Sequence, residues 1–126
     1  MTLWTQQGQM TPRGEFAVRI RAGTGPVLVL VHGWPESGHC WTPVAECLPT
    51  DWTLIAPDLR GLGDSNREPD LAAYAKDALA ADMLGLLDVL GVGDFALVGH
   101  DWGGIVAQEM AFAAPERISH LAIANI

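Results

Sequence analysis

Short apolar runs separated by longer mixed segments dominate the pattern of the sequence. Residues 27–31, Val-Leu-Val-Leu-Val, form an unbroken apolar run, which predicts a strand covered on both faces. Residues 52–56 and 95–98 are similar runs, and residues 120–126 predict the beginning of another strand. Residues 16–21 alternate between apolar and polar side chains, which is typical of a half-exposed strand.

Three of the segments between these runs predict helices. Apolar residues recur every three or four positions over residues 70–90, and Gly91 follows directly, so a long helix is expected to end there. Residues 102–113 predict a second helix, which stops near Pro115. Residues 39–48 contain a short helix that begins near Ser37.

The alternation of strands and helices indicates an α/β protein with a mostly parallel sheet, flanking helices and right-handed crossovers. The polar residues 1–14 form either a frayed end or a first edge strand. The last run, residues 123–126, is apolar and is followed by neither a loop nor a helix. We therefore expect residues 1–126 to be one partial domain, truncated relative to a complete protein.

Composition narrows the possible partners. The 126 residues carry a net charge of −8 with only seven Lys and Arg, which argues against nucleic acid or an anionic membrane surface. No apolar run reaches the ~18 residues of a membrane span, and no signal peptide is recognisable. Cys40 and Cys47 are predicted to be free thiols, because their helical spacing puts them roughly 10 Å apart, so a reducing, cytoplasmic location is expected.

The sequence lacks the residue spacings that are typical of metal sites and of phosphate-binding loops. No cluster of His, Cys and Asp has the spacing of metal ligands. Residues 61–63, Gly-Leu-Gly, lack the strand, helix and lysine that surround the glycines of a phosphate-binding loop. We therefore expect neither a metal nor a cofactor.

The segment Gly99-His100-Asp101-Trp102-Gly103 lies between a predicted buried strand and a predicted helix. It matches the Gly-x-Ser-x-Gly nucleophile elbow with Asp101 in place of serine. The glycines permit a tight turn that pushes the central side chain above the carboxyl edge of the sheet, where the N-terminus of the helix favours an anion. An aspartate before a helix is more often only an N-cap. The doubled glycines and the buried strand favour the interpretation of Asp101 as a nucleophile.

A carboxylate nucleophile displaces a leaving group from saturated carbon and forms an ester with the substrate. Hydrolysis of that ester develops an oxyanion on the Asp101 side chain, which requires hydrogen-bond donors. The predicted donors are the backbone N–H of Trp102 and that of Trp34, in the segment His32-Gly33-Trp34-Pro35 that follows the strand at residues 27–31. The two indole side chains are expected to pack in the wall of the pocket.

Other polar residues near these motifs are interpreted as structural. His32 at a strand end is expected to brace its loop through hydrogen bonds rather than to act as a base. His100 has the same interpretation and is expected to point away from Asp101. The loop at residues 57–69 carries four polar residues that are expected to satisfy its own backbone: Asp58, Arg60, Asp64 and Ser65.

Three ordered motifs resemble those of soluble epoxide hydrolases, which belong to the α/β-hydrolase superfamily. They are His-Gly-Trp-Pro-Glu-Ser at residues 32–37, Asp-Leu-Arg-Gly-Leu-Gly-Asp-Ser at 58–65 and Gly-His-Asp-Trp-Gly-Gly at 99–104. The resemblance runs from about Phe16 onward and implies the N-terminal half of an α/β-hydrolase fold. Haloalkane and haloacid dehalogenases are close relatives. Fluoroacetate-type dehalogenases usually carry Arg at the position of Trp102, and haloalkane dehalogenases tend to carry Asn at that of Trp34, so both positions favour an epoxide hydrolase.

The resemblance implies a hydrolase acting at saturated carbon, in which Asp101 forms an alkyl-enzyme ester and an epoxide is opened to a diol. A haloalkane or haloacid dehalogenase with the same nucleophile is the alternative, because Trp follows the nucleophile in both groups. A truncated, non-catalytic fragment or an interaction protein is an alternative of another class. The implied partners are water and a small hydrophobic epoxide or halogenated substrate, without nucleic acid or membrane.

The family's remaining machinery consists of cap tyrosines, a later acidic residue and a histidine that activates water. By the resemblance, these residues would lie beyond Ile126. Tyr74, the chain's one tyrosine, does not match a cap position, and His120 is expected at the surface.

Overall fold

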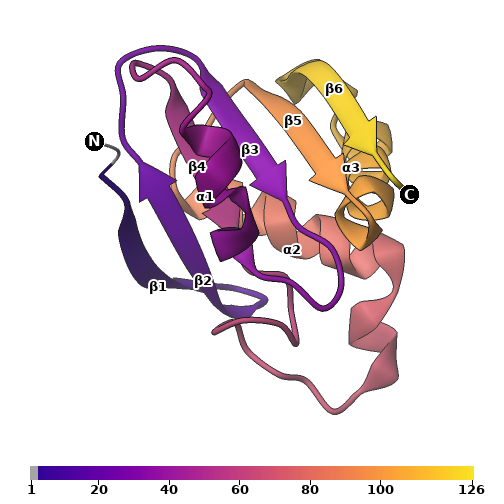
Figure 1. The fold of residues 1–126 in the computed structure, drawn as a ribbon. Coiled ribbons are helices and arrows are strands. Elements are labelled where there is room, and N and C mark those ends of the chain that lie inside the picture. Colours follow the sequence, from indigo (N-terminus) through magenta and orange to yellow (C-terminus); the bar gives the residue numbers. More distant parts are fainter. Residues whose placement is uncertain (1–2) are drawn as a thin grey trace.

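The computed structural model describes residues 3–126, and these residues form a six-stranded sheet with the order β1-β2-β4-β3-β5-β6 (Figure 1). The strands are β1 (Thr5–Thr11), β2 (Gly14–Arg21), β3 (Val27–Val31), β4 (Thr53–Pro57), β5 (Phe95–His100) and β6 (Ile118–Ala124). The predicted strands are confirmed with small shifts at their ends. Of the two alternatives for residues 1–14, the edge strand is found over Thr5–Thr11, and residues 1–2 lie outside the described residues.

The sheet is mixed. Strands β4, β3, β5 and β6 are parallel, as predicted, whereas β2 pairs antiparallel with both β1 and β4. The difference has a simple cause at the β1–β2 connection, where Pro12 and Arg13 alone link Thr11 to Gly14. A connection of two residues can form only an antiparallel hairpin, because a parallel pair needs a crossover segment.

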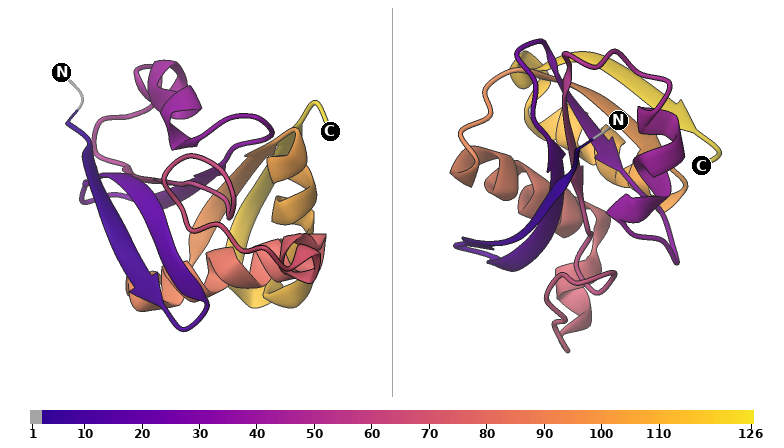
Figure 2. Two further views of the ribbon diagram at one scale, coloured as in Figure 1. Left: turned by 90° about the horizontal axis from the view of Figure 1, so that it is seen from below. Right: turned by 60° about the vertical axis from the view of Figure 1, so that its left-hand side comes forward.

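Helices cover both faces of the sheet (Figure 2). The elements are η1 (Gly38–Trp41), α1 (Thr42–Ala45), η2 (Leu71–Tyr74), α2 (Lys76–Val89), α3 (Trp102–Ala113) and η3 (Pro115–Arg117). Helices α2 and α3 pack on one face, and η1 with α1 lies on the other. Ser37 accepts a hydrogen bond from the His39 N–H, as expected for the start of the short helix.

The helix predicted over residues 70–90 is interrupted. Ala75 has extended backbone angles (φ −62°, ψ 147°), so a 3-10 turn precedes α2 in place of one continuous helix. Two local hydrogen bonds compete with helix continuation: Asp70 accepts from the Ala72 N–H at 3.0 Å, and the Tyr74 hydroxyl accepts from the Glu68 N–H at 2.9 Å. These bonds tie the turn back to the preceding loop.

The predicted end of this helix at Gly91 is confirmed. Gly91 has φ +75°, a conformation that suits glycine. Its N–H donates to the Asp88 carbonyl at 3.1 Å, and the Val92 N–H donates to the Leu87 carbonyl at 3.0 Å. This pair of bonds is the Schellman motif that satisfies the last carbonyls of α2.

Alternate residues of the central strands feed two separate hydrophobic cores. Val29 and Val31 of β3 belong to the larger core, beneath α2 and α3, whereas Leu28 and Leu30 belong to the smaller core beneath α1. The larger core also contains several fully buried side chains from other elements: Phe16, Met83, Leu86, Leu97 and Met110. Burial on both faces explains why β3 is an unbroken apolar run.

The α1 face of the sheet is only partly covered. An apolar groove of about 640 Å³ lies over β3, β5 and β6 on this face, and Leu28, Val98 and Ala122 are among its lining residues. Most side chains of β6 are exposed, and within the described residues β6 has a paired strand on one edge only.

A buried ionic network fastens the loop after β4 to helix α2. Arg60 binds the Asp82 carboxylate through two hydrogen bonds of 2.8 Å, and Arg13 adds a third bond of 2.8 Å. Asp82 is fully buried, and the Arg60 side chain is 7% exposed. Arg60 also donates to the Asn66 side chain and to the Arg13 carbonyl, both at 2.6 Å.

Asp58 and Ser65 satisfy backbone groups of this loop, as predicted. The prediction is wrong for Arg60, which binds Asp82, and for Asp64, whose carboxylate accepts a hydrogen bond of 3.0 Å from the Gln6 side chain. The buried Asp58 carboxylate accepts hydrogen bonds from the N–H groups of Gly38 at 2.7 Å and of Asp64 at 3.0 Å. The Ser65 hydroxyl donates to the Asp58 carbonyl at 2.6 Å and accepts from the Ala17 N–H at 3.0 Å. The loop is therefore held from inside the fold.

The Arg60–Asp82 pair yields a test of stability. The substitution Asp82→Asn leaves the Arg60 guanidinium buried without a countercharge, so we expect it to lower the free energy of unfolding by about 3–5 kcal/mol. Urea denaturation followed by circular dichroism measures this change. The matched control is Asp88→Asn, which removes the charged partner of Arg117. The Asp88 side chain is 66% exposed, so we expect the free energy of unfolding to change by at most about 1 kcal/mol. Equal effects of the two substitutions would contradict the assigned role of Asp82.

Candidate active site

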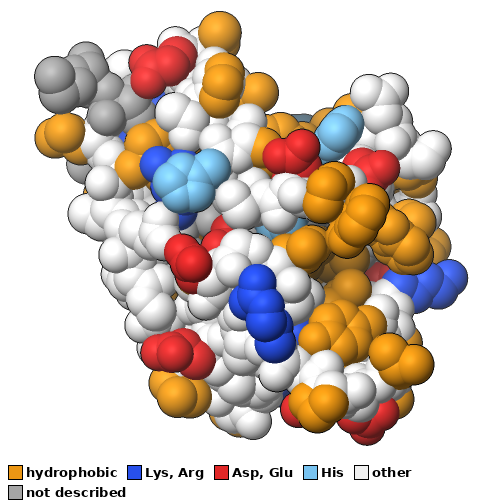
Figure 3. All heavy atoms as spheres, turned by 60° about the horizontal axis from the view of Figure 1, so that its bottom comes forward, with side chains coloured by type: hydrophobic (Ala, Val, Ile, Leu, Met, Phe, Trp, Pro, Cys, Tyr) orange, Lys and Arg blue, Asp and Glu red, His pale blue; other side chains and the backbone are white. Residues whose placement is uncertain are grey.

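Three loops meet at the carboxyl edge of the parallel strands (Figure 1). They follow β3, β4 and β5, and they carry Trp34, Leu62 and Asp101 respectively. In open α/β sheets, ligands bind at this edge because the connections after the strands diverge there. Hydrophobic side chains gather around a hollow on this side of the molecule (Figure 3).

Asp101 occupies a strained turn between β5 and α3. Its backbone angles are φ 58° and ψ −128°, outside the regions that side-chain-bearing residues favour. The turn is possible because its neighbours lack side chains: a Cβ on Gly99 would strike the Gly103 carbonyl, and a Cβ on Gly103 would strike the Val31 carbonyl. The two glycines predicted to permit a tight turn are thus required by contacts with backbone.

The loop after β3 closes onto the Asp101 side chain. The Trp34 N–H donates a hydrogen bond of 3.0 Å to Asp101 Oδ2. A Cβ on Gly33 would lie 2.8 Å from Asp101 Cγ and closer still to its Cβ, so only glycine permits this approach. The structure therefore brings Trp34, Asp101 and the adjacent Trp102 together, as the sequence motifs predict.

Backbone donors hold the pKa of the Asp101 carboxyl below its ordinary value. The N–H of Trp102 has the largest effect, followed by that of Trp34, and the charge of His100 acts in the same direction. Hydrogen bonds to the charged form stabilise it. Asp101 is therefore a carboxylate at neutral pH. The Trp102 N–H acts on it from the adjacent residue without the geometry of a capping hydrogen bond, whereas the Trp34 N–H makes a hydrogen bond of ordinary length.

His32 is fully buried and braces two loops, which confirms its structural interpretation. Its Nε2 accepts a hydrogen bond of 2.9 Å from the Leu59 N–H, so the ring proton lies on Nδ1, which donates to the Gly33 carbonyl at 2.8 Å. Burial lowers the pKa of His32, which keeps the imidazole neutral. Both ring nitrogens are occupied, so His32 has no nitrogen with which to accept another proton.

The other predicted histidine roles have mixed outcomes. His120 is exposed on β6 and contacts the Ser119 hydroxyl, which confirms its surface position. His100 pairs with Ala124 at the end of β5, and within the described residues its side chain makes no hydrogen bond to Asp101. The orientation predicted for His100 stays a prediction.

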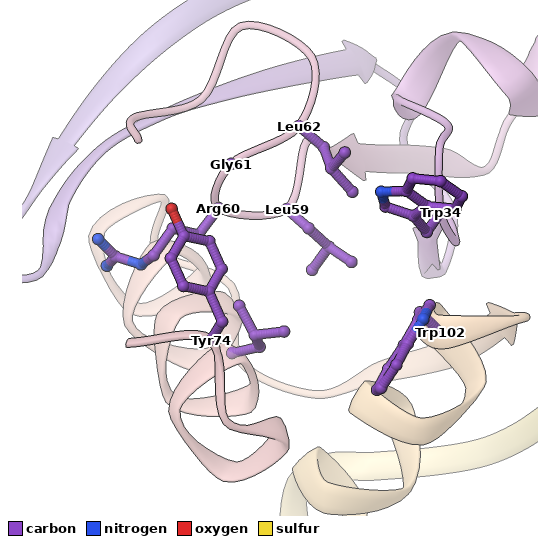
Figure 4. Close-up of a pocket in the computed structure, with 8 residues that line it drawn as sticks. Trp34, Leu59, Arg60, Gly61, Leu62, Tyr74 and Trp102 are labelled. Atoms are coloured by element: carbon purple, nitrogen blue, oxygen red, sulfur yellow. The ribbon is translucent and has the colours of Figure 1, made fainter. Parts of the chain in front are cut away.

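A cavity of about 320 Å³ is lined by Trp34, whose N–H binds the Asp101 carboxylate, and by Trp102, the residue after Asp101 (Figure 4). Asp101 itself is not among the lining residues. The indoles of Trp34 and Trp102 form one side, and Tyr74 lies opposite them. The remaining lining residues come from the loop after β4 and from α2: Leu59, Arg60, Gly61, Leu62 and Leu79. Trp34 and Trp102 remain 66% and 50% exposed, so both indoles present apolar surface to a bound molecule.

The sequence motifs predict that Trp34 and Trp102 line a pocket, but they do not predict the lining residues on the opposite side of this cavity. Leu79 is at a helical core position, and Tyr74 is part of the same apolar repeat, so neither stands out. Leu62 carries a usable signal, since it is an apolar residue between Gly61 and Gly63 in an otherwise polar loop. A leucine at such a position is exposed to solvent unless it faces a pocket or a partner.

Within residues 3–126, no group of three or more His, Cys, Asp and Glu side chains could hold a metal ion. The same residues contain no helix that is both long enough and apolar enough to cross a membrane. Cys40 and Cys47 are both free thiols. Burial raises the pKa of Cys40 to about 11, which keeps this thiol protonated.

Comparison with known proteins agrees with the geometry. A family model for the alpha/beta hydrolase fold matches residues 26–126. A soluble epoxide hydrolase of Corynebacterium sp. (strain C12) is 41% identical over 107 residues, which cover 85% of this chain and 37% of the relative. A fluoroacetate dehalogenase of Burkholderia sp. is also 41% identical over 107 residues, covering 82% of this chain and 35% of the relative.

Solved structures give the same result. The ligand-free epoxide hydrolase CorEH superposes with a TM-score of 0.89 at 37% identity, over 96% of this chain and 42% of that one. The epoxide hydrolase VrEH1 from Vigna radiata has a TM-score of 0.89 at 31% identity, over 98% and 40% of the two chains. The chain thus spans little more than a third of the length of the curated relatives. By its sheet, its strained turn and its match to the family model, this chain belongs to the alpha/beta hydrolase fold family.

Proposed function

We propose that Asp101 is the nucleophile of an epoxide hydrolase and forms an ester with a carbon of the epoxide ring. One observation carries the proposal: the Asp101 carboxylate sits on a strained turn and accepts a hydrogen bond from the Trp34 N–H, and Trp34 and Trp102 line an apolar cavity. A bond forms between a carboxylate oxygen and the ring carbon while the ring C–O bond breaks. The ring oxygen leaves with the electron pair and takes up a proton from water.

The second half of the reaction is attack of water on the carbonyl carbon of the ester. An oxyanion then develops on the former Asp101 carboxylate. The backbone N–H groups of Trp34 and Trp102 already favour negative charge at this position in the unreacted protein, which supports their proposed role as oxyanion donors. They would favour the tetrahedral intermediate for the same reason.

The second step also needs a base to activate water. Of the four histidines, all among the described residues, His32 has both ring nitrogens in hydrogen bonds, and His39 and His120 are exposed on η1 and β6. In the described part of the chain, His100 makes no hydrogen bond to Asp101, and it is predicted to point away from it. None of the four supports the role of base. We therefore propose that residues 3–126 supply the group that forms the ester, and that the ester accumulates when this chain acts alone.

Displacement of a halide from saturated carbon is the second candidate. It uses the same carboxylate, and the halide takes the place of the ring oxygen as leaving group. The observation that favours it is the fluoroacetate dehalogenase of Burkholderia sp., which is as similar to this chain as the soluble epoxide hydrolase of Corynebacterium sp.. The two candidates differ in the first product, since only an epoxide leaves its oxygen in the adduct.

Intact mass spectrometry tests the nucleophile directly. After incubation with styrene oxide, we expect one adduct per chain, with its mass equal to that of the epoxide, and peptide mapping is expected to place it on Asp101. Asp101→Asn is expected to abolish the adduct, because an amide is a far weaker nucleophile than a carboxylate. Asp94→Asn, at an exposed carboxylate just before β5, is the control and should leave the adduct unchanged. Labelling by a bromoalkane and not by the epoxide would favour the dehalogenase, and labelling by neither would contradict the assigned nucleophile.

The pH dependence of ester formation follows from the lowered pKa of Asp101. Its ordinary value is 3.8, and the backbone donors move it lower, so the reactive carboxylate persists as the pH falls to that value. We expect a constant labelling rate from about pH 8 to about pH 5, with a loss only near or below the ordinary pKa. The rate is measured by mass spectrometry where circular dichroism shows a folded protein. A loss of labelling rate between pH 7 and pH 5 would instead mean that the pKa of the nucleophile lies above the ordinary carboxyl value of about 4.

Gly33 yields a test of positioning. Gly33→Ala places a methyl group against the Asp101 side chain, so the carboxylate or the Trp34 loop must move. We expect ester formation to slow by about 100-fold, the typical cost of displacing a reacting group by about 1 Å. Gly93→Ala is the matched control, because a Cβ there meets no atom within 4 Å. Retention of the full labelling rate by Gly33→Ala would show that the closure of this loop on Asp101 has no part in the reaction.

A further inference from the structure

We infer that the cavity lined by Trp34 and Trp102 binds a flat, uncharged substituent of the substrate, and that Leu62 sets the size of the substituent it accepts. The inference rests on the proposed function in one respect, because it places the reacting carbon at Asp101. It goes further by assigning a specificity-determining residue to the loop after β4.

The shape of the cavity favours a flat group. The Trp34 and Trp102 indoles line one side, and the Tyr74 ring lies across the cavity from them (Figure 4). Aromatic side chains on opposite sides of a cavity contact another ring with favourable geometry as well as burying apolar area. A volume of about 320 Å³ is at the lower end of the range for small-molecule sites, so one ring with a short side chain is a suitable occupant.

The charge of the cavity disfavours an anionic substrate. Arg60 is the one charged residue among the lining residues of the described chain, and each of its three side-chain nitrogens already donates to protein acceptors. The Asp82 carboxylate neutralises its charge at 2.8 Å. A substrate carboxylate would lose its hydration here without gaining a free cation, which costs free energy.

Leu62 is the lining residue that can change size without moving the site. Its loop backbone is fixed by hydrogen bonds from the Leu62 N–H to the Leu59 carbonyl at 3.0 Å and from the Ser65 N–H to the Leu62 carbonyl at 3.2 Å. The Leu62 side chain is only partly buried and packs against the edge of the main core, whereas Leu59 and Leu79 are 2% and 8% exposed and lie within that core.

The aromatic lining residues are constrained in other ways. Trp34 and Trp102 have backbone groups next to the Asp101 carboxylate. Tyr74 is fixed by the Glu68 N–H at its hydroxyl and by close packing over Gly61, where a Cβ would lie 2.7 Å from Tyr74 Cε1. Substitution at these positions would disturb the nucleophile or the fold, so Leu62 is the position at which size can vary.

The test compares epoxides of different size in Leu62 variants. In Leu62→Trp the larger side chain fills the cavity, so we expect labelling by styrene oxide to slow by about 10-fold or more. Labelling by propylene oxide, whose methyl group does not need the cavity, is expected to stay within about 2-fold. Leu62→Ala is expected to raise the rate for naphthyl oxirane relative to that for styrene oxide. Val89→Trp, which introduces the same side chain at an exposed position of α2, is the control.

A charged epoxide tests the second half of the inference. We expect 4-(oxiran-2-yl)benzoate to label the wild-type chain at least about 10-fold more slowly than styrene oxide, because its carboxylate finds no free cation. Equal or faster labelling by the benzoate would overturn the assignment of an uncharged substituent. Equal slowing of styrene oxide and propylene oxide in Leu62→Trp, or no slowing of either, would overturn the role of Leu62.

Binding without reaction separates this inference from the proposed function. Ethylbenzene has the ring but no epoxide, and its binding is followed by ligand-observed NMR in the same variants. We expect binding by the wild type and by Val89→Trp, and loss of binding in Leu62→Trp. Ethylbenzene binding without any epoxide labelling would reject the nucleophile but keep the cavity, whereas unchanged binding in Leu62→Trp would reject the cavity assignment. Circular dichroism checks the fold, and Leu62→Phe replaces Leu62→Trp if the larger side chain prevents folding.

Discussion

The hydrogen bond from the Trp34 N–H to the Asp101 carboxylate joins two loops that are 67 residues apart in the sequence. It forms because β3 and β5 are neighbours in the sheet and because Gly33 leaves room for the Asp101 side chain. The strained turn at Asp101 alone would present a carboxylate to solvent. The Trp102 N–H on the turn lowers the pKa of the carboxylate most, and the Trp34 N–H of the closed loop adds to this effect and fixes the orientation of the carboxylate.

Buried hydrogen bonds fix the position of the loop after β3 through its contacts with the loop after β4. His32 links the end of β3 to Leu59 after β4, and the buried Asp58 carboxylate closes the latter loop onto Gly38. The Arg60–Asp82 pair then fastens the loop to α2. Polar groups buried in this way restrict the loop to one conformation, because every alternative leaves a charge or an N–H unpaired.

The parts of the structure that the sequence predicts are those with a local physical cause. The apolar run of β3, the glycines around Asp101 and the Gly91 helix end each follow from a few adjacent residues. The interruption at Ala75 depends on a bond between Glu68 and Tyr74, and periodicity contains no information about it. The wall formed by Leu62 and Tyr74 likewise arises only when the loop after β4 folds against α2, so spacing along the chain does not reveal it.

The net negative charge of the chain affects how the exposed part of the sheet at β6 can associate with other molecules. Within residues 3–126, an apolar groove and an edge of β6 without a paired strand together offer a surface onto which a strand of another molecule could be added. Two copies approaching through this surface must bring their net charges of −8 together, so electrostatic repulsion opposes sheet extension at neutral pH. High ionic strength screens that repulsion, and acidification toward the isoelectric point of about 4.7 removes it, so association through this surface depends on the solvent conditions.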